Sequence, residues 1–305
     1  NMLGNYEYFY DIDGRFIFQK KKTYINTSFN NLKTNENKMY AVTKATNATS
    51  AKIKIRTVEL PEYRLSLTPP SGYADAAIYV DGILYTATAS DGNYVVDLPH
   101  TEGRTAVMYY YDAAGIPRGM YVWTLKFENG GYIASAHSGL QDLLSYHGFS
   151  IRVQEPAGIR FKSGISEDIR AQLMEGNVDG FVLEEYGTLM MTNANRSSFP
   201  FVKLGSKTAG GRSYWTENGV VNDKIFETVS GRIRFASVLT GLPEERYATD
   251  FAFRGYIILD KDGERYIIYG PEVYRSVYTV AKQIQAKGEF EEGSDGYLYI
   301  QGIID

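Results

Sequence analysis

The chain has 305 residues, 44% of them hydrophobic and 22% charged, which is the composition of a folded globular protein with room for two or three domains. Thirty-two basic and thirty-six acidic side chains give a net charge of −4, without the basic excess of a nucleic-acid-binding protein. Cysteine is absent, which excludes disulfides, thiolate catalysis and cysteine-bound zinc.

The sequence shows no membrane-spanning run and no visible signal peptide. No run reaches the length of about 18 apolar residues that a membrane-spanning helix needs, so we predict no membrane insertion. A basic, then apolar, then small-residue start is also missing. Because the first residue is Asn1 and not Met, we expect a truncated N-terminus, which leaves room for an export signal upstream.

The first recognisable pattern is "YEYFYDIDGRFIFQKKK", Tyr6–Lys22, which places Asp-x-Asp-Gly between two aromatic runs. An EF-hand calcium loop needs Gly at its sixth position and an acidic residue at its twelfth. Counted from Asp11, Gly14 stands at the fourth position and Lys22 at the twelfth. The spacing therefore predicts a hairpin turn and no metal site.

Asp/Asn-Gly pairs recur along the chain, mostly between short runs rich in β-branched and aromatic residues. They stand at positions 13–14, 81–82, 91–92, 129–130, 179–180, 218–219, 262–263 and 295–296. Such pairs favour the two-residue turns with positive φ that match the twist of paired strands. We therefore expect a chain built mainly of hairpins.

The texture of the sequence divides it into three regions, and the predicted fold is mainly β. Residues 1–60 form an N-terminal β-hairpin element and a linker. Residues 61–137 carry evenly spaced short strand candidates, which predict an Ig-like β-sandwich with Trp123 in its core. Residues 138–305 form a strand-dominated α+β domain with two or three short helices.

Three helices are expected in this last region. Residues 138–148 place Leu140, Leu143 and Leu144 on one helical face and end at Gly148. Residues 167–176 follow Ser166, a favourable N-cap. The third helix is expected over residues 275–288. Its apolar face would be Val277, Val280, Ala281 and Ile284, and Gly288 would end it.

Residues that could carry catalysis or bind a metal are sparse. The three histidines, His100, His137 and His147, would all have to converge to make a metal site, and the helix dipole explains His147 more simply. A Ser-His-Asp triad leaves no trace in sequence, and a Gly-x-Ser-x-Gly elbow is missing. Glu184 and Glu185 adjoin on a predicted strand and point to opposite faces. We therefore predict no catalytic residues, no metal and no cofactor.

A set of arginines and tyrosines in the last region is more suggestive. These residues lie beside apolar strand or helix positions: Arg160, Tyr186, Arg254, Tyr256, Arg275 and Tyr278. Arginines in apolar strands can form a structural network with carboxylates such as Glu185. Alternatively, arginine forks and tyrosine rings can build a polar groove that binds a sugar or a carboxylate. On this second interpretation the set is the predicted ligand-binding site.

Two stretches resemble known proteins. "LGNYEYFYDIDGRFIFQKKKTYINTSFNN", within residues 1–31, resembles hub or baseplate proteins of the tail-endopeptidase type from phages of Gram-positive bacteria, although no endopeptidase residue is present. Residues 65–285, including "GMYVWTL" and "FAFRGYIIL", are similar to an uncharacterised module of secreted multidomain Firmicutes proteins. The resemblance implies an extracellular protein, on a virion tail or a bacterial cell surface.

These observations lead to one functional hypothesis and two alternatives. The expected function is that of a non-catalytic phage or prophage tail component with a surface-binding, carbohydrate-binding module. Its partners would be a bacterial surface glycan or other tail or surface proteins, and not nucleic acid. The first alternative is a secreted Firmicutes cell-surface protein in which an Ig-like spacer precedes a polysaccharide-binding module. The second is a glycan hydrolase, which rests on carboxylates that nothing in the sequence singles out.

Overall fold

The computed structural model describes residues 63–70, 77–98, 103–196, 201–203 and 225–305. Outside these ranges it places five strands as backbone only: β1 (Tyr6–Tyr10), β2 (Phe16–Lys21), β3 (Lys38–Lys44), β4 (Ile53–Glu59) and β16 (Tyr214–Glu217). Strands β1 and β2 pair antiparallel, as the aromatic pattern predicted, and β3 pairs with β4. The Asp13-Gly14 turn lies outside the described residues. None of the helices in the described ranges has the length and apolar character needed to cross a membrane.

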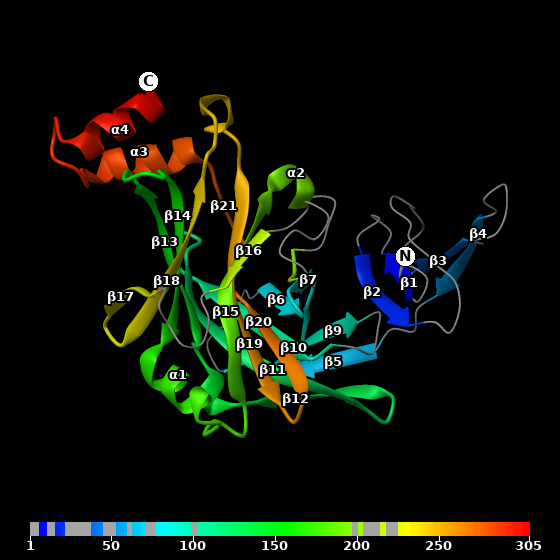
Figure 1. Cartoon of the computed structure of the whole chain (residues 1–305). Helices are drawn as coiled ribbons and strands as arrows, with labels where there is room; N and C mark the ends of the chain where they lie inside the picture. The colour runs from blue at the N-terminus through cyan, green and yellow to red at the C-terminus, as the bar shows by residue number, and fades with distance from the viewer. Residues whose placement is uncertain are drawn as a thin grey trace.

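The first unit of the described residues is a β-sandwich of two antiparallel sheets (Figure 1). One sheet has the order β12-β11-β10-β6-β7 and the other β5-β9-β8. Their strands are β5 (Tyr63–Leu67), β6 (Ala77–Val80), β7 (Ile83–Tyr85), β8 (Thr88–Ser90), β9 (Asn93–Leu98), β10 (Thr105–Tyr111), β11 (Pro117–Glu128) and β12 (Gly131–Ala136). Alternate residues of both sheets meet in one core that contains Leu65, Val96, Met108 and Trp123. The predicted core position of Trp123, 3% exposed, is confirmed.

The Asp/Asn-Gly pairs form the expected turns at most described positions. Both residues have positive φ at 81–82, 91–92, 129–130 and 262–263, where each pair joins two antiparallel strands. Ser230-Gly231 makes a turn with the same signs of φ, which the Asp/Asn rule did not predict. The prediction for Asp295-Gly296 was wrong, because these two residues begin a helix. Their neighbour Ser294 caps that helix by accepting a hydrogen bond from the Tyr297 N–H, 3.2 Å away.

The second unit is built from two further antiparallel sheets. One has the order β13-β14-β18-β17, and the other has the order β16-β15-β19-β20, with β21 also paired to β19. Their strands are β13 (Leu144–Arg152), β14 (Gly158–Ser166), β15 (Val182–Thr192), β17 (Ile225–Val229), β18 (Arg232–Thr240), β19 (Phe251–Lys261), β20 (Glu264–Tyr269) and β21 (Val273–Arg275). Phe161 of β14 stacks on Phe253 of β19 with ring centroids 5.6 Å apart, so the two sheets pack directly on each other.

Helices cover the two ends of this second unit (Figure 1). Helix α1 (Glu167–Met174) begins at Ser166, whose hydroxyl accepts from the Ile169 N–H as predicted. Helix α3 (Val277–Lys287) buries the predicted apolar face, and Gly288 ends it with φ of 63°. Helix α4 (Asp295–Ile304) packs with α3 at the opposite end from α1. Two short helical segments, α2 (Asn193–Arg196) and the 3-10 turn Glu244–Arg246, complete this part of the chain.

The helix predicted over residues 138–148 is wrong. Only Ser138–Leu140 form a 3-10 turn, Asp142 then takes a φ of 52°, and strand β13 begins at Leu144. The three leucines are buried as a helix would bury them, but the chain reaches the core in an extended conformation, because β13 pairs with β14. Gly148, the predicted helix cap, lies with φ of 78° at the register shift between Tyr146 and Phe149. Tertiary pairing has therefore overridden a helical spacing of leucines.

His147 consequently lies in strand β13, so a helix dipole does not explain it. Its Nε2 is 2.7 Å from Ser145 Oγ, and Gly164 lies directly beneath the ring, where a Cβ would come within 2.5 Å of Nε2. Burial, followed by the charges of Arg234, Arg232 and Lys162, lowers the pKa of His147 from 6.5 to about 4. The histidine is therefore neutral in the folded protein at pH 7.

This neutral His147 predicts a stability that falls in mild acid. Between pH 6.5 and about 4, His147 is protonated in the unfolded chain but stays neutral in the folded chain. The free energy of unfolding therefore decreases as the pH falls through this range. The whole shift corresponds to roughly 3 kcal/mol, which solvent screening of the half-buried ring reduces to about 1 kcal/mol. Urea titrations at pH 7 and 4.5 should show this loss in the wild type and a smaller loss in His147→Gln. Equal losses in both proteins would contradict the assignment.

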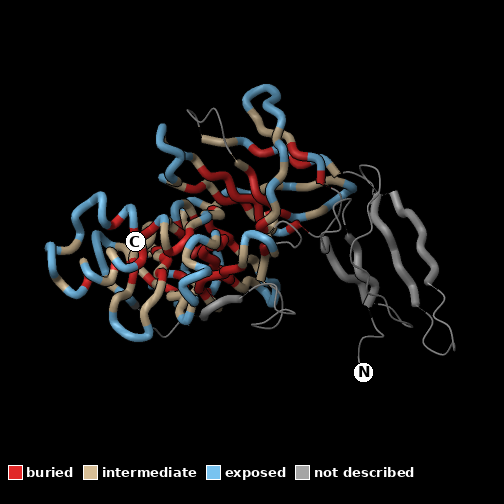
Figure 2. The backbone as a smooth tube through the Cα atoms, turned by 90° about the horizontal axis from the view of Figure 1, so that it is seen from above, coloured by how far each residue is buried: buried red, intermediate tan, exposed pale blue. Residues whose placement is uncertain are grey.

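The two units share one apolar core. Strand β10 of the five-stranded sheet is buried on both faces, because Val107 and Tyr109 alternate with the residues that face the sandwich core. The buried residues run through the interior of the tube in Figure 2. Val107 and Tyr109 belong to the same cluster as Leu144, Ile257 and Leu259 of the second unit. The Tyr109 hydroxyl also donates to the Tyr269 carbonyl. The predicted boundary between residues 137 and 138 is thus crossed by continuous packing.

Candidate functional site

Of the six residues predicted to bind a ligand, the structure fully buries three. Tyr186, Arg254 and Tyr256 each have 0% of their surface exposed. Arg254 lies on β19, and its guanidinium donates to three backbone carbonyls: Nε to Gly270 at 3.0 Å, and Nη1 to Gly82 at 2.8 Å and Phe201 at 3.0 Å. A ligand at the surface cannot touch these side chains. Arg254 instead ties the β6–β7 turn of the sandwich to the second unit.

The carboxylate that accompanies Arg254 is Glu272. Its Oε1 lies 3.6 Å from Arg254 Nη1, and Arg196 holds the same carboxylate with two hydrogen bonds of 2.8 and 3.0 Å. Burial opposes ionisation of Glu272, but the charges of Arg254 and Arg196 outweigh it, so the pKa of Glu272 lies below its ordinary value. Glu272 is therefore a carboxylate between two guanidinium groups.

Glu185, the carboxylate expected to pair with the arginines, has other partners. It accepts from the Lys203 ammonium and from the Tyr256 hydroxyl. Its neighbour Glu184 binds Arg265, with Arg265 Nε 2.9 Å from Oε2. The structural-network interpretation thus describes Arg254 and Glu185, although the two belong to separate pairings.

The other three predicted residues are partly exposed and lie apart from the buried network. Arg160 covers the ring of Phe226 at 4.4 Å, and Arg275 lies 5.7 Å from the ring of Phe149. Tyr278, on α3, lies beneath the Lys282 ammonium at 4.4 Å. Each makes a local cation–π contact. The structure does not bring the six residues into one groove.

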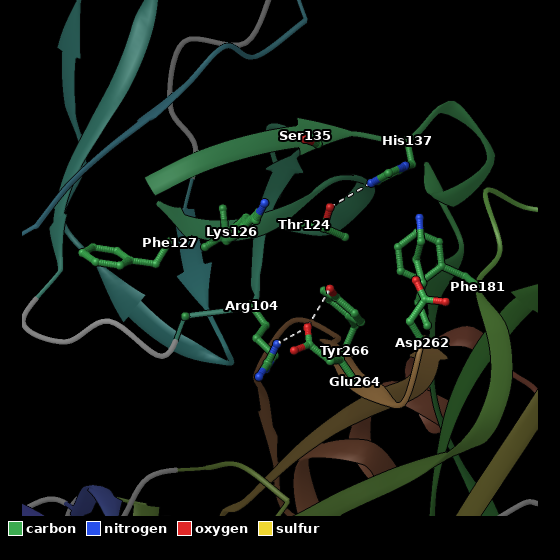
Figure 3. Close-up of a pocket in the computed structure, with 13 residues that line it drawn as sticks. Arg104, Thr124, Lys126, Phe127, Ser135, His137, Phe181, Asp262, Glu264 and Tyr266 are labelled. Carbon is green, nitrogen blue, oxygen red and sulfur yellow. Dashed lines mark hydrogen bonds and ion pairs between the residues drawn. The ribbon is translucent and has the colours of Figure 1, made fainter. Parts of the chain in front are cut away.

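A large cleft opens elsewhere, between the outer face of the sandwich sheet and the β19–β20 hairpin (Figure 3). It encloses about 870 Å³, within the range of ligand-binding sites. Strand β11 contributes Thr124 and Lys126 to one wall, at positions that alternate with the core residues Trp123 and Leu125. The period-two alternation of a strand therefore points these polar side chains into the cleft.

Charged residues face each other across this cleft. Arg104 Nη1 lies 2.7 Å from Glu264 Oε2, and both side chains are about half exposed. Lys261 and Asp262, at the tip of the β19–β20 hairpin, also line the cleft. The site therefore offers both hydrogen-bond donors and acceptors in fixed positions, as a polyhydroxylated ligand requires.

Aromatic rings form the apolar part of the cleft. Phe181 packs edge-on against Tyr266, with ring centroids 5.4 Å apart, and edge-on against His137 at 5.1 Å. The Lys261 ammonium lies 4.9 Å from the ring of Phe181. Phe127 lines the other end. Phe181 is itself only 1% exposed, so the partly exposed ring of Tyr266 is the aromatic surface that stands beside the charged groups.

A chain of hydrogen bonds runs along one wall of the cleft. His137, just beyond the end of β12, has Nε2 2.8 Å from Thr124 Oγ1 and Nδ1 2.7 Å from Asp179 Oδ2. Because a carboxylate can only accept, Nδ1 carries a proton, and in the neutral imidazole Nε2 accepts from the Thr124 hydroxyl. The His137 side chain is 15% exposed and that of Asp179 is 60% exposed. The histidine is thereby fixed in one orientation and one tautomer.

The metal hypothesis finds no constellation in the described part of the chain, where no three His, Asp or Glu side chains gather as ligands. His100, one member of the hypothetical three-histidine site, lies outside the described residues. His137 and His147 have hydroxyl partners, Thr124 and Ser145.

Comparison with known proteins adds little. No protein-family model matches the chain, and no curated protein matches it. Among solved structures it is similar to a DUF3823 family protein from Bacteroides ovatus, with 14% identity over 71% of this chain and 100% of that chain, and a TM-score of 0.29. A similarity of this size carries no argument about fold or function. Both rest here on the chain's own geometry.

Proposed function

We propose that this chain is an extracellular binding protein whose cleft between strand β11 and the β19–β20 hairpin holds a bacterial surface glycan. The observation that carries the proposal is the composition of the cleft, in which the partly exposed ring of Tyr266, backed by the buried Phe181, stands beside Arg104, Lys261 and Glu264. Sugars present apolar ring faces and many hydroxyl groups, so aromatic side chains next to charged donors and acceptors complement them. Rigid strands and a two-residue turn present these groups, which limits the entropy lost on binding.

The setting of this binding function follows from the resemblance of residues 1–31 to phage tail proteins. We propose a tail-associated protein that contacts the host surface. The alternative is a secreted Firmicutes protein with an Ig-like spacer and a polysaccharide-binding module. The genes flanking the reading frame distinguish the two, because tail genes support the first and wall-anchoring repeats support the second.

Binding experiments can distinguish the cleft from the site that was predicted from the sequence, because the two sites contain different arginines. On an array of Gram-positive surface polysaccharides we expect Arg104→Met to weaken binding at least tenfold, which corresponds to about 1.4 kcal/mol. Arg160→Met and Arg275→Met are matched controls, because they remove partly exposed arginines outside the cleft. These two variants should bind like the wild type. Loss of binding in the controls with retention in Arg104→Met would refute the cleft as the binding site.

A further inference from the structure

We propose that the cleft also hydrolyses carboxylic esters, such as acyl groups on sugar hydroxyls, with Thr124 as the nucleophile, His137 as the general base and Asp179 as the residue that positions the histidine. The glycan part of this substrate rests on the proposed function, whereas the ester chemistry stands on the geometry alone. The inference replaces the sequence-based expectation of a purely non-catalytic module.

The geometry is that of an activated hydroxyl. Thr124 Oγ1 and His137 Nε2 are 2.8 Å apart, and His137 Nδ1 and Asp179 Oδ2 are 2.7 Å apart. A nucleophile within hydrogen-bond reach of a base, itself oriented by a third group, is the arrangement that hydroxyl nucleophiles require. Thr124 and His137 both line the 870 Å³ cleft (Figure 3), so a substrate can reach the hydroxyl. The ring of Phe181 buttresses the imidazole from the side.

The three residues come from separate parts of the fold. Thr124 lies in the middle of β11, His137 follows β12, and Asp179 lies in the turn of the Val178–Phe181 bridge, with φ of 48°. Thr124 and His137 belong to the sandwich, and their hydrogen bond lies within that unit. Asp179 belongs to the second unit, so the arrangement is complete only where the two units meet.

The reaction proceeds in two balanced steps. Thr124 Oγ attacks the ester carbonyl carbon, its proton moves to His137 Nε2, and the bond to the alcohol oxygen breaks as that oxygen takes the proton. Water then attacks the acyl-threonine and gives one proton to Nε2, from which Thr124 recovers it as the carboxylic acid leaves. Asp179 stabilises the imidazolium formed in each step. Ester and water become acid and alcohol, and no other reactant is needed.

The neighbourhood favours esters and supplies a positive charge. Lys126 is two residues from Thr124 on the same strand and lines the same cleft. Its ammonium pairs with Glu128 Oε2 at 3.2 Å on a side chain that is 74% exposed, and it would have to leave this ion pair to meet the negative charge that develops on the carbonyl oxygen. Asp179 is 60% exposed, and water weakens its pull on the imidazolium. An ester, whose alkoxide leaves more easily than an amine, suits such a base better than an amide.

The test measures release of 4-nitrophenol from 4-nitrophenyl acetate, together with mass spectrometry of the protein after reaction with a fluorophosphonate. We expect turnover by the full chain, a loss of at least a hundredfold in Thr124→Val and in His137→Gln, and the label on Thr124. Asp179→Asn should lower kcat and change the pH profile, which a merely structural residue would not do. Thr88→Val, the same change on the exposed strand β8, is the matched control and should keep full activity.

Two outcomes overturn the proposal: no turnover and no label in the wild type, or a Thr124→Val variant that keeps wild-type turnover. Circular dichroism of Thr124→Val shows whether the variant is folded, and the position of the label in the wild type tests the proposal independently of any variant. Failure of the esterase reaction with retained glycan binding leaves the proposed function standing. Turnover of the small ester without glycan binding refutes the glycan and keeps the triad.

Discussion

Replacing Glu272 with glutamine should lower the free energy of unfolding by about 3–5 kcal/mol. The change keeps the shape of the side chain and removes the charge that two arginines share. Arg254 is 0% exposed and lies among the rings of Tyr269, Tyr79 and Phe201 at 4.9, 5.2 and 5.7 Å. Without Glu272 the buried charge of Arg254 would be compensated by these rings and by three backbone carbonyls, with no carboxylate beside it. Urea denaturation at pH 7 measures the loss.

The matched control for Glu272→Gln is Glu184→Gln, which removes a carboxylate from an ion pair with the 65% exposed side chain of Arg265. Water screens such a pair, so we expect a loss of under about 1 kcal/mol. The double variant Arg254→Met/Glu272→Gln should be more stable than the sum of the single changes predicts, because Glu272→Gln leaves a buried charge without its carboxylate only while Arg254 is present. Equal effects of Glu272→Gln and Glu184→Gln would show that the buried network contributes no special stability.

Glu272 and His147 both make the protein less stable in acid, but for different reasons: the fold favours the charged form of Glu272 and the neutral form of His147. The folded pKa of Glu272 lies below its ordinary value of 4.5, so its contribution is present above that pH and is lost as the pH falls through the folded pKa. The loss linked to His147 occurs at higher pH, between 6.5 and about 4. Acid unfolding of the wild type should therefore begin with His147, and Glu272→Gln should flatten the curve below about pH 4.5.

Local signals predicted the strands and two helices well, because each rests on residues that contact one another along the chain. Ser166 caps α1, and Gly288 ends α3 in the left-handed conformation that glycine favours. The same local logic failed for Leu140 and Leu144, since pairing of β13 with β14 decided their conformation. It failed again for Asp295-Gly296, where the Ser294 cap outweighed the turn preference.

The candidate site was almost invisible in the sequence, because its residues meet only through tertiary packing. Thr124, His137 and Asp179 are separated by 13 and then 42 positions. Nothing in that spacing predicts a contact, and His137 had been considered only as a metal ligand. One usable signal was present in β11, where Thr124 and Lys126 alternate with the buried Trp123 and Leu125. A structural network of arginines and carboxylates was one of the two interpretations of the apolar strand around Arg254, but the sequence did not indicate its partner Glu272.

Truncating Leu144 in the shared core to alanine should lower the free energy of unfolding by about 2–5 kcal/mol. Leu144 is 3% exposed and lies where the two units meet. Its backbone N–H points at the Met120 sulfur of the sandwich, 3.4 Å away, and its side chain fills the space above Gly255 and Gly270. Those glycines have no side chains that could close the resulting cavity, so the full cost of the void remains.

Because this packing is continuous, Leu144→Ala should weaken both units together. Hydrogen exchange should show an equal loss of protection for the amides of β10 in the sandwich and of β14 in the second unit, and urea unfolding should remain one transition. Leu298→Ala, on α4 with 58% of the residue exposed, is the control and should change stability by less than about 0.5 kcal/mol. If β14 alone lost protection, the units would be independent folding domains. A single cooperative unit has a functional consequence, because the cleft is built from both sides of this junction and would keep its shape only while both remain folded.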